Sequence, residues 1–254
     1  MKRLIVVALL VCAACVPIVA QASRPKLFDF REASRNKPPA ITSAQSRKVL
    51  AAVFPKYLTD ARFCRADVDA SGAEDYLAAM RKAGQIVPEV VDSAVGSYTA
   101  PRQQETAYII WVGECNASHA DNFGSKRLAI FAGNKLVLNQ DVDFKGSILK
   151  KTDLDINGVD ELLLSGGDMN QGIVVETAAL YEVRNRKLVT IQDFQKVSED
   201  SCATLMRGSS VEASVIFLGS ERLGEKPTLQ IENYRSGCGR TKRWKLFSKG
   251  PMQF

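Results

Sequence analysis

Nine residues in the middle of the chain, 153–161, carry oxygen-bearing side chains at a spacing that suits a calcium ion. Positions one, three, five and nine of this stretch are oxygen donors and position six is glycine: Asp153, Asp155, Asn157, Glu161 and Gly158. Ca²⁺ takes about six to eight oxygen ligands, and a tight loop can turn alternate side chains toward one point. The carbonyl of Val159 would supply the position-seven ligand. The sequence therefore predicts calcium as the cofactor, with these ligands: Asp153, Asp155, Asn157, Val159 and Glu161.

Two other interpretations of this loop exist. An EF-hand requires a bidentate Glu at position twelve, where this chain has Leu164 inside an apolar run, so that interpretation fails. A turn without an ion remains the alternative, because Asp, Asn and Gly populate turns freely.

The loop resembles the calcium-loop repeat of integrin-type propellers, the FG-GAP or VCBS-like repeat. In that family an Asp-x-Asp-x-Asn/Asp-Gly-x-x-Asp loop joins two strands, and here the apolar run Leu162–Leu164 and the small residues 165–167 follow it in the same way. The resemblance covers about residues 152–173 in a single copy, and Glu161 replaces the usual Asp. It implies calcium binding, but a single copy does not imply a closed propeller.

A second stretch has similar spacing, with Asp67, Asp69, Ser71, Gly72 and Asp75. Because Ser71 and Glu74 also have the spacing of a helix capping box, we interpret this stretch as the start of a helix rather than a second metal site.

No catalytic group stands out, and we expect no catalytic residues. His119 is the single histidine, and the chain contains no Gly-x-Ser-x-Gly nucleophile motif. The alternative function is a carboxylate-dependent hydrolase of the envelope, in which His119, Asp121 and Asp168 are the loop groups to mutate. We expect the following acidic groups near strand ends to be solvated: Glu105, Glu114, Asp121, Asp141, Asp143 and Asp168.

The N-terminus has the order of an export signal. Lys2 and Arg3 precede an apolar run, and residues 20–22 form a small-x-small cleavage site. We expect residues 1–22 to be removed and the protein to be secreted to the periplasm or the extracellular space. A lipid anchor on Cys12 or Cys15 is the minor alternative, and no transmembrane segment is expected in the mature chain. Loss of Lys2 and Arg3 lowers the formal charge from +6 to +4, which does not suggest a nucleic-acid partner.

Four cysteines remain after such a cleavage. An even number in an oxidising compartment predicts two disulfides, for which three connectivities exist. We favour the sequential pairing of Cys64 with Cys115 and of Cys202 with Cys238, because each bridge then joins residues of one half of the chain.

Helical patterns are confined to the first part of the chain. Residues 23–41 are polar and contain three prolines, which predicts a flexible leader. Thr42 and Gln45 have capping-box spacing before a helix that ends near Pro55, and a second helix is expected from Ser71 to Gly84. We therefore expect residues 42–104 to form a small helical layer.

From residue 105 onward the pattern is that of a mainly β, antiparallel domain. Continuous apolar runs at residues 108–112 and 162–164 predict buried strands, and alternation over residues 173–183 and 211–217 predicts strands with one buried face. Gly133-Asn134 and residues 184–186 are expected hairpin turns. Residues 166–172 are expected to connect strands. The sheets would form a sandwich or an incomplete propeller-like arrangement.

Arg240–Lys245 combines four basic residues with Trp244. It could meet an anionic glycan or a lipid surface, although a charged edge strand is the plainer interpretation. Together these features predict an exported, non-catalytic, calcium-stabilised β module that binds a protein or a glycan.

Overall fold

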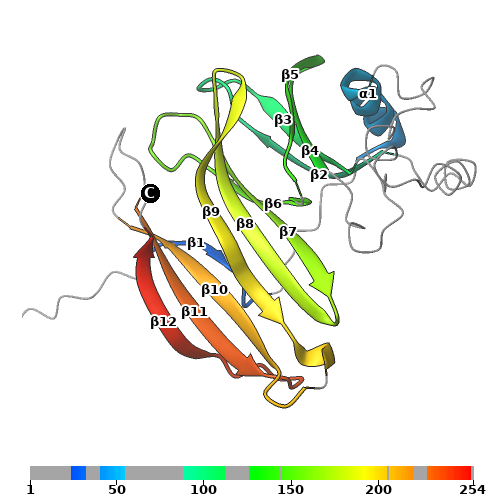
Figure 1. Ribbon diagram of the computed structural model, residues 1–254. Helices are drawn as coiled ribbons and strands as arrows, with labels where there is room; N and C mark the ends of the chain where they lie inside the picture. Colours follow the sequence, from blue (N-terminus) through cyan, green and yellow to red (C-terminus); the bar gives the residue numbers. More distant parts are fainter. Residues whose placement is uncertain are drawn as a thin grey trace, which may run out of the picture.

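A computed structural model describes residues 24–32, 41–54, 88–111, 126–143, 145–204, 206–219 and 228–252. It confirms the predicted fold class: a mainly β protein with a small helical element and antiparallel sheets (Figure 1). The expected signal sequence, the helix at residues 71–84, the Asp67–Asp75 stretch, His119, Cys64 and Cys115 lie outside the described residues. Within the described part of the chain, no helix is both long and apolar enough to cross a membrane.

The strands form a long sheet and a short sheet. The long sheet has the order β12-β11-β10-β9-β8-β7-β6, with β1 paired to β10, and the short sheet has the order β2-β3-β4-β5. The elements of the long sheet are β1 (Lys26–Asp29), β6 (Ser147–Thr152), β7 (Glu161–Asn170), β8 (Ile173–Arg184), β9 (Lys187–Asp200), η2 (Cys202–Thr204), β10 (Ser210–Leu218), β11 (Leu229–Gly237) and β12 (Lys245–Met252). The others are α1 (Ser43–Val53), β2 (Glu89–Gly96), β3 (Glu105–Trp111), β4 (Lys126–Ala132) and β5 (Lys135–Asp141).

Three hydrophobic clusters lie between the packed elements: α1, the short sheet and the two parts of the long sheet. Val49 and Val53 of α1 pack against Ile110 and neighbours on one face of the short sheet. The other face of the short sheet, with Ile109, packs on Leu162 and Leu164 of β7. Successive residues of β3 and β7 thus face different clusters, which explains why their apolar runs are continuous rather than alternating.

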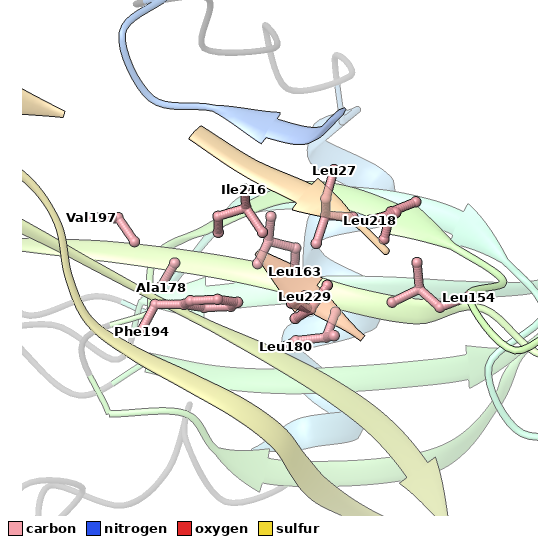
Figure 2. Packing of buried hydrophobic residues seen from close by; sticks show 10 residues of the cluster. All are labelled: Leu27, Leu154, Leu163, Ala178, Leu180, Phe194, Val197, Ile216, Leu218 and Leu229. Atoms are coloured by element: carbon pink, nitrogen blue, oxygen red, sulfur yellow. The ribbon is translucent and has the colours of Figure 1, made fainter. Parts of the chain in front are cut away.

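The third cluster lies inside the long sheet, which bends so that β1, β10 and β11 pack on β7, β8 and β9. Figure 2 shows Leu27 of β1, together with Ile216 and Leu218 of β10, against Leu163 of β7 and its neighbours. This part of the protein is a sheet-on-sheet packing. Leu154, at one end of the cluster in Figure 2, is 1% exposed and anchors the loop that follows β6.

Local signals gave several element boundaries correctly. The hydroxyl oxygen of Thr42 accepts a hydrogen bond from the Gln45 N–H, so Thr42 caps α1 as predicted. The β8–β9 hairpin turns at Asn185 and Arg186, both with positive φ, between the paired residues Arg184 and Lys187. The β4–β5 hairpin turns at Gly133, whose φ is +59°.

Three expectations about the chain's organisation were wrong. Residues 26–29 are not flexible leader but strand β1, which pairs with β10 about 190 residues further along the chain. Residues 89–96 are not part of a helical layer but form β2, the edge of the short sheet. Residues 166–170 are not a connection but the second half of β7, so the turn to β8 contains only Gln171 and Gly172. β1 depends on pairing with a distant strand, and β2 is an edge strand with many polar residues. Neither strand therefore has a strong local hydrophobic pattern.

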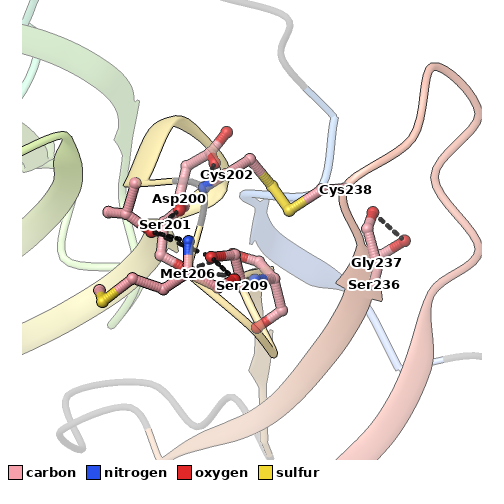
Figure 3. Close-up of a disulfide and its surroundings, with 10 residues drawn as sticks. Asp200, Ser201, Cys202, Met206, Ser209, Ser236, Gly237 and Cys238 are labelled. Atoms are coloured by element: carbon pink, nitrogen blue, oxygen red, sulfur yellow. Dashed lines mark hydrogen bonds between the residues drawn. A yellow bond between two sulfur atoms is a disulfide. The ribbon is translucent and has the colours of Figure 1, made fainter.

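A disulfide joins Cys202 in η2 to Cys238, one residue after β11 (Figure 3). It is one of the two pairs that the sequence predicted. The bridge closes a loop of 36 residues, which corresponds to about 4 kcal/mol of lost unfolded-state entropy. It joins the C-terminal end of β11, after which residues 239–244 begin, to η2, which follows β9.

Candidate metal centre

Residues 153–160 connect β6 to β7, and the strand pairing brings the two ends of this loop together. Thr152 and Glu161 are directly opposite each other in the antiparallel ladder. Glu161 therefore returns to a position beside Asp153, the residue after Thr152. Positions one and nine of the pattern are neighbours because a hairpin closes between them, rather than because the loop coils on itself.

Three carboxylates converge at this point. Asp153, Asp155 and Glu161 each offer an oxygen, and these atoms lie within 4.8 Å of one another. Two oxygens bound to one Ca²⁺ at about 2.3–2.6 Å can be at most about 5 Å apart, so this spacing fits a single calcium ion. Hard cations prefer carboxylate oxygens of this kind, and the donor set therefore suits the ion that the sequence predicts.

Glu161 is the most buried member of the group, with 3% of its surface exposed. Burial, with smaller contributions from the charges of Asp155 and Asp153, raises the pKa of Glu161 to about 7. A hydrogen bond of 2.7 Å from the Leu154 N–H to Glu161 Oε2 acts in the opposite direction. Three negative charges in a partly buried site repel one another, and a bound cation would remove that repulsion.

Backbone N–H groups fold the loop around its own acidic side chains. The Asp153 carboxylate accepts hydrogen bonds from Asn157 N at 3.0 Å and from Gly158 N at 2.8 Å. Asp155 Oδ1 accepts from Asn157 N at 3.2 Å. Both Asp side chains are thereby directed to the inside of the turn.

The other two predicted ligands are less well defined. Asn157 is exposed, and its Oδ1 accepts a 2.6 Å hydrogen bond from Val159 N instead of belonging to the group of three carboxylates. No interaction places the carbonyl of Val159 at the carboxylates. The ligand roles of Asn157 and Val159 therefore stay predictions.

Gly158 is required at its position for two reasons. Its φ of +86° lies in the left-handed region, which side chains other than glycine adopt with strain. A Cβ at this position would also lie 3.0 Å from Cβ of Pro101, in the connection between β2 and β3. The loop therefore approaches the short sheet closely at Gly158.

Asp160 fixes the loop to the same connection, and the sequence pattern gave no indication of this role. Its Oδ2 accepts from the Ser97 N–H at 2.8 Å, and its own N–H donates to the Ser97 carbonyl at 2.6 Å. Lys151 Nζ lies 3.3 Å from the same carboxylate oxygen. In the loop pattern Asp160 is one of the unspecified positions, so only the structure shows that its carboxylate binds Ser97 and Lys151.

Glu105 binds the two residues that follow Ser97. We expected Glu105 to be solvated, but it is 1% exposed, and this expectation was wrong. Its Oε2 accepts hydrogen bonds from Tyr98 N and Thr99 N, both at 2.7 Å, and the Thr99 hydroxyl donates to Oε1. A carboxylate at the start of a strand can be buried when it satisfies the N–H groups of the preceding turn.

Asp92 provides another link between the sheets. It lies on β2, is 9% exposed, and accepts through Oδ2 from Ile148 N of β6 at 2.7 Å. Burial raises the pKa of Asp92, and the hydrogen bonds from Ile148 and Ser93 oppose the rise. The loop of residues 153–160 is thus held between two sheets that carboxylate–backbone hydrogen bonds join.

Of the hydrolase candidates, only Asp168 lies within the described residues. It is exposed on β7 and lines a hollow of about 310 Å³ together with Glu199 of β9.

No protein-family model matches the chain, and comparisons with curated proteins and with solved structures find no similar protein. The likeness to FG-GAP-type loops therefore rests on residues 152–173 alone.

Proposed function

We propose that this protein is an exported, non-catalytic β module, stabilised by one Ca²⁺ in the loop between β6 and β7, that binds a protein or a glycan at the cell envelope or outside the cell. The observation that carries the calcium site is the convergence of Asp153, Asp155 and Glu161 within 4.8 Å. Within the described part of the chain, no Lys or Arg forms an ion pair with any of the three. A divalent cation would supply the missing positive charge.

A structural role for the ion follows from the loop's surroundings. Leu154 inserts into the core of the long sheet, and Asp160 binds Ser97 beside the short sheet. An ion that orders the residues between them would strengthen the link between the two sheets. Because such an ion binds the folded loop and not the unfolded chain, it raises stability by mass action.

Export is supported by the residue order of 1–22 and by the Cys202–Cys238 disulfide. Disulfides persist in oxidising compartments such as the periplasm and the extracellular space. We propose the binding role because a β scaffold stabilised by a disulfide and a metal ion would present a rigid surface outside the cell.

The alternative is a hydrolase that uses carboxylates. One observation favours it: Asp168 and Glu199 line the same surface hollow. If these groups are catalytic, Asp168→Asn and Glu199→Gln should each abolish hydrolysis of an envelope polymer by the purified protein. An unchanged rate in both variants would remove this alternative.

Calorimetric titration with CaCl₂ after treatment with a chelator tests the calcium site. We expect one site per chain, with an affinity in the range of about 10⁻⁶ to 10⁻³ M. Asp153→Asn combined with Asp155→Asn should abolish the binding heat, because these changes remove two ligand charges at almost constant shape.

Asp160→Asn is the matched control, since it removes a charge from the same loop outside the three converging carboxylates. It should retain binding. Equal loss of binding in the control and in the double variant, or no binding by the unaltered protein, would contradict the proposed site.

A further inference from the structure

A shallow hollow of about 210 Å³ lies on the long sheet, across β9 to β12. Pockets for drug-sized ligands are about 300–1,000 Å³, so this hollow suits one ring of a ligand rather than a whole large molecule. It is lined by polar groups and by one aromatic ring: Lys196, Ser198, Glu212, Ser214, Asn233 and Phe247.

A β-bulge places the aromatic ring at the hollow. Asn233 pairs with Ser248 and Tyr234 pairs with Leu246, so Phe247 is an extra residue on β12. Bulges redirect side chains and occur often beside binding sites. The guanidinium carbon of Arg235 lies 4.9 Å from the centre of the Phe247 ring, and the residue is still 47% exposed. The ring is therefore held from one side while much of its surface remains available.

The polar groups form a hydrogen-bonded row across three strands. Ser214 Oγ of β10 donates to Asn233 Oδ1 of β11 at 2.7 Å, and Asn233 Nδ2 donates to Ser248 Oγ of β12 at 2.8 Å. Ser214 is 3% exposed, so its hydroxyl group is fixed in place, and its hydrogen bond fixes the orientation of the Asn233 amide. A row of oriented donors and acceptors beside a partly exposed ring suits a sugar, because a sugar has hydroxyl groups at its edge and an apolar C–H face.

The charged groups in the hollow neutralise one another. Glu212 lies 3.2 Å from Lys196 Nζ and 2.6 Å from an Arg235 nitrogen, and Lys196 also lies 3.0 Å from Glu199. Hydrogen bonds from Arg235 and Lys196 outweigh the effect of burial and lower the pKa of Glu212. Glu212 is therefore an ionised acceptor at neutral pH, and the hollow itself carries little net charge.

Positive charge is concentrated at one end of the hollow. Lys245 pairs with Arg235 across the strands, and the chain between β11 and β12 adds three exposed basic residues. Among the described residues, none of these four forms an ion pair with an acidic group: Arg240, Lys242, Arg243 and Lys245. This excess of positive charge is complementary to an acidic ligand.

The basic segment is held in place at both ends. The Cys202–Cys238 disulfide fixes its start, as Figure 3 shows, and the Arg243 N–H donates to Ser236 Oγ at 2.8 Å near its end. A charged segment that is ordered before binding loses less entropy on binding. This arrangement favours a defined binding site over a solvated charge cluster.

We propose that the hollow binds one ring of an acidic saccharide. The C–H face of the sugar packs on Phe247, its hydroxyl groups bond to Asn233 and Glu212, and its acid group points to the basic residues at 240–245. The inference rests on the proposed binding function and names the ligand class and the site. A ring that enters a hollow distinguishes this ligand from a flat anionic membrane, which would contact the basic residues alone.

Calorimetry of the purified chain with three acidic tetrasaccharides tests the inference: one carrying uronic acids, one carrying sulfates and one carrying phosphates. Each is compared with its neutral counterpart. We expect at least one acidic probe to bind and its neutral counterpart to bind at least about tenfold more weakly. Because acidic sugars also bind Ca²⁺, each titration is repeated with a chelator, and the saccharide should still bind to protein that a melting scan shows to be folded.

Two variants locate the site. Phe247→Ala should weaken binding by about tenfold or more through loss of the stacked ring, and Arg243→Glu should do so by placing a like charge beside the acid group. Lys48→Glu on α1 and Met169→Ala on β7, both at exposed positions, are the matched controls and should bind as the unaltered protein does. Since Phe247 and Arg243 lie at the surface, at least one of the two variants should fold.

Several results would overturn the inference. These are the absence of binding to all three acidic probes, equal binding of acidic and neutral sugars, and unchanged binding in both site variants. Binding to anionic vesicles that Phe247→Ala leaves unchanged would show that the basic residues serve a membrane, and binding of an acidic peptide in preference to the sugars would show a protein ligand. If another ligand binds and neither Phe247→Ala nor Arg243→Glu changes its binding, the inferred saccharide site is wrong while the proposed binding function stands. If neither a glycan nor a protein binds, both fail.

Discussion

Asp160 and Ser97 exchange hydrogen bonds in both directions: the Asp160 N–H donates to the Ser97 carbonyl at 2.6 Å, and the Ser97 N–H donates to Asp160 Oδ2 at 2.8 Å. These residues are 63 positions apart and belong to connections of different sheets. The pair fixes the loop of residues 153–160 to the β2–β3 connection.

Asp160→Ala should therefore lower the free energy of unfolding by about 1–3 kcal/mol, because the half-buried Ser97 N–H loses its partner. Denaturant titration measures this change. Asp160→Asn keeps an acceptor oxygen and should cost less. A loss in the Ala variant no greater than that in the Asn variant would show that the hydrogen bond contributes nothing.

Gly158→Ala should destabilise the protein by about 1 kcal/mol or more, because alanine is strained at positive φ and its Cβ would meet Pro101. Gly133→Ala is the control, since Gly133 also has positive φ but has no neighbour within 4 Å of an added Cβ. Melting scans should show a larger fall in melting temperature for Gly158→Ala than for Gly133→Ala. Equal losses at both positions would mean that the contact with Pro101 is unimportant.

The stability of the folded protein should depend on pH through Asp29 of β1, which is 9% exposed. Burial acts to raise its pKa, but hydrogen bonds from Arg31 and Lys26 outweigh burial and lower it below the ordinary value of 3.8. A lowered pKa means that the ionised form stabilises the folded state. This stabilisation is complete above pH 3.8 and is lost as the pH falls through the folded-state pKa.

Denaturant titrations at a series of acidic pH values measure this effect. Asp29→Asn should be less stable than the unaltered protein at neutral pH, and the difference should shrink in acid. A difference that stays constant with pH would show that the charge of Asp29 is not responsible.

Removal of the disulfide by Cys202→Ser together with Cys238→Ser should lower stability by about 2–5 kcal/mol, because the unfolded chain regains the freedom of a 36-residue loop. Denaturant titration measures this loss, and its slope should rise, because the unfolded chain becomes less compact without the bridge. A loss below about 1 kcal/mol would contradict this account and would show that the bridge strains the folded state or that the unfolded chain retains structure.

Much of the β architecture could be predicted because its signals are local. The alternation in β10, the apolar run in β7 and the turn residues Asn185 and Arg186 each reflect contacts within a few residues or the burial of a whole strand. β1 could not be found in this way, since its pairing with residues 215–217 of β10 depends on the folded sheet. Its short length and its basic neighbours favour no particular structure.

The same distinction applies to the candidate site. The positions of Asp153, Asp155 and Glu161 follow a fixed spacing, so their convergence could be expected from the sequence. The burial of Glu105 and the role of Asp160 could not be expected. Glu105 binds backbone N–H groups of Tyr98 and Thr99 in the turn before its strand, which no spacing pattern marks, and Asp160 binds Ser97 in a connection of the other sheet. A carboxylate that satisfies backbone N–H groups looks the same in sequence as a solvated one.

A crystal structure of the protein grown with CaCl₂ tests the central claim most directly. The account predicts one ion bound by Asp153, Asp155 and Glu161 at about 2.3–2.6 Å, the distance that calcium–oxygen bonds have in proteins. Carboxylates turned toward solvent with no ion between them, at calcium concentrations that would saturate such a site, would contradict it.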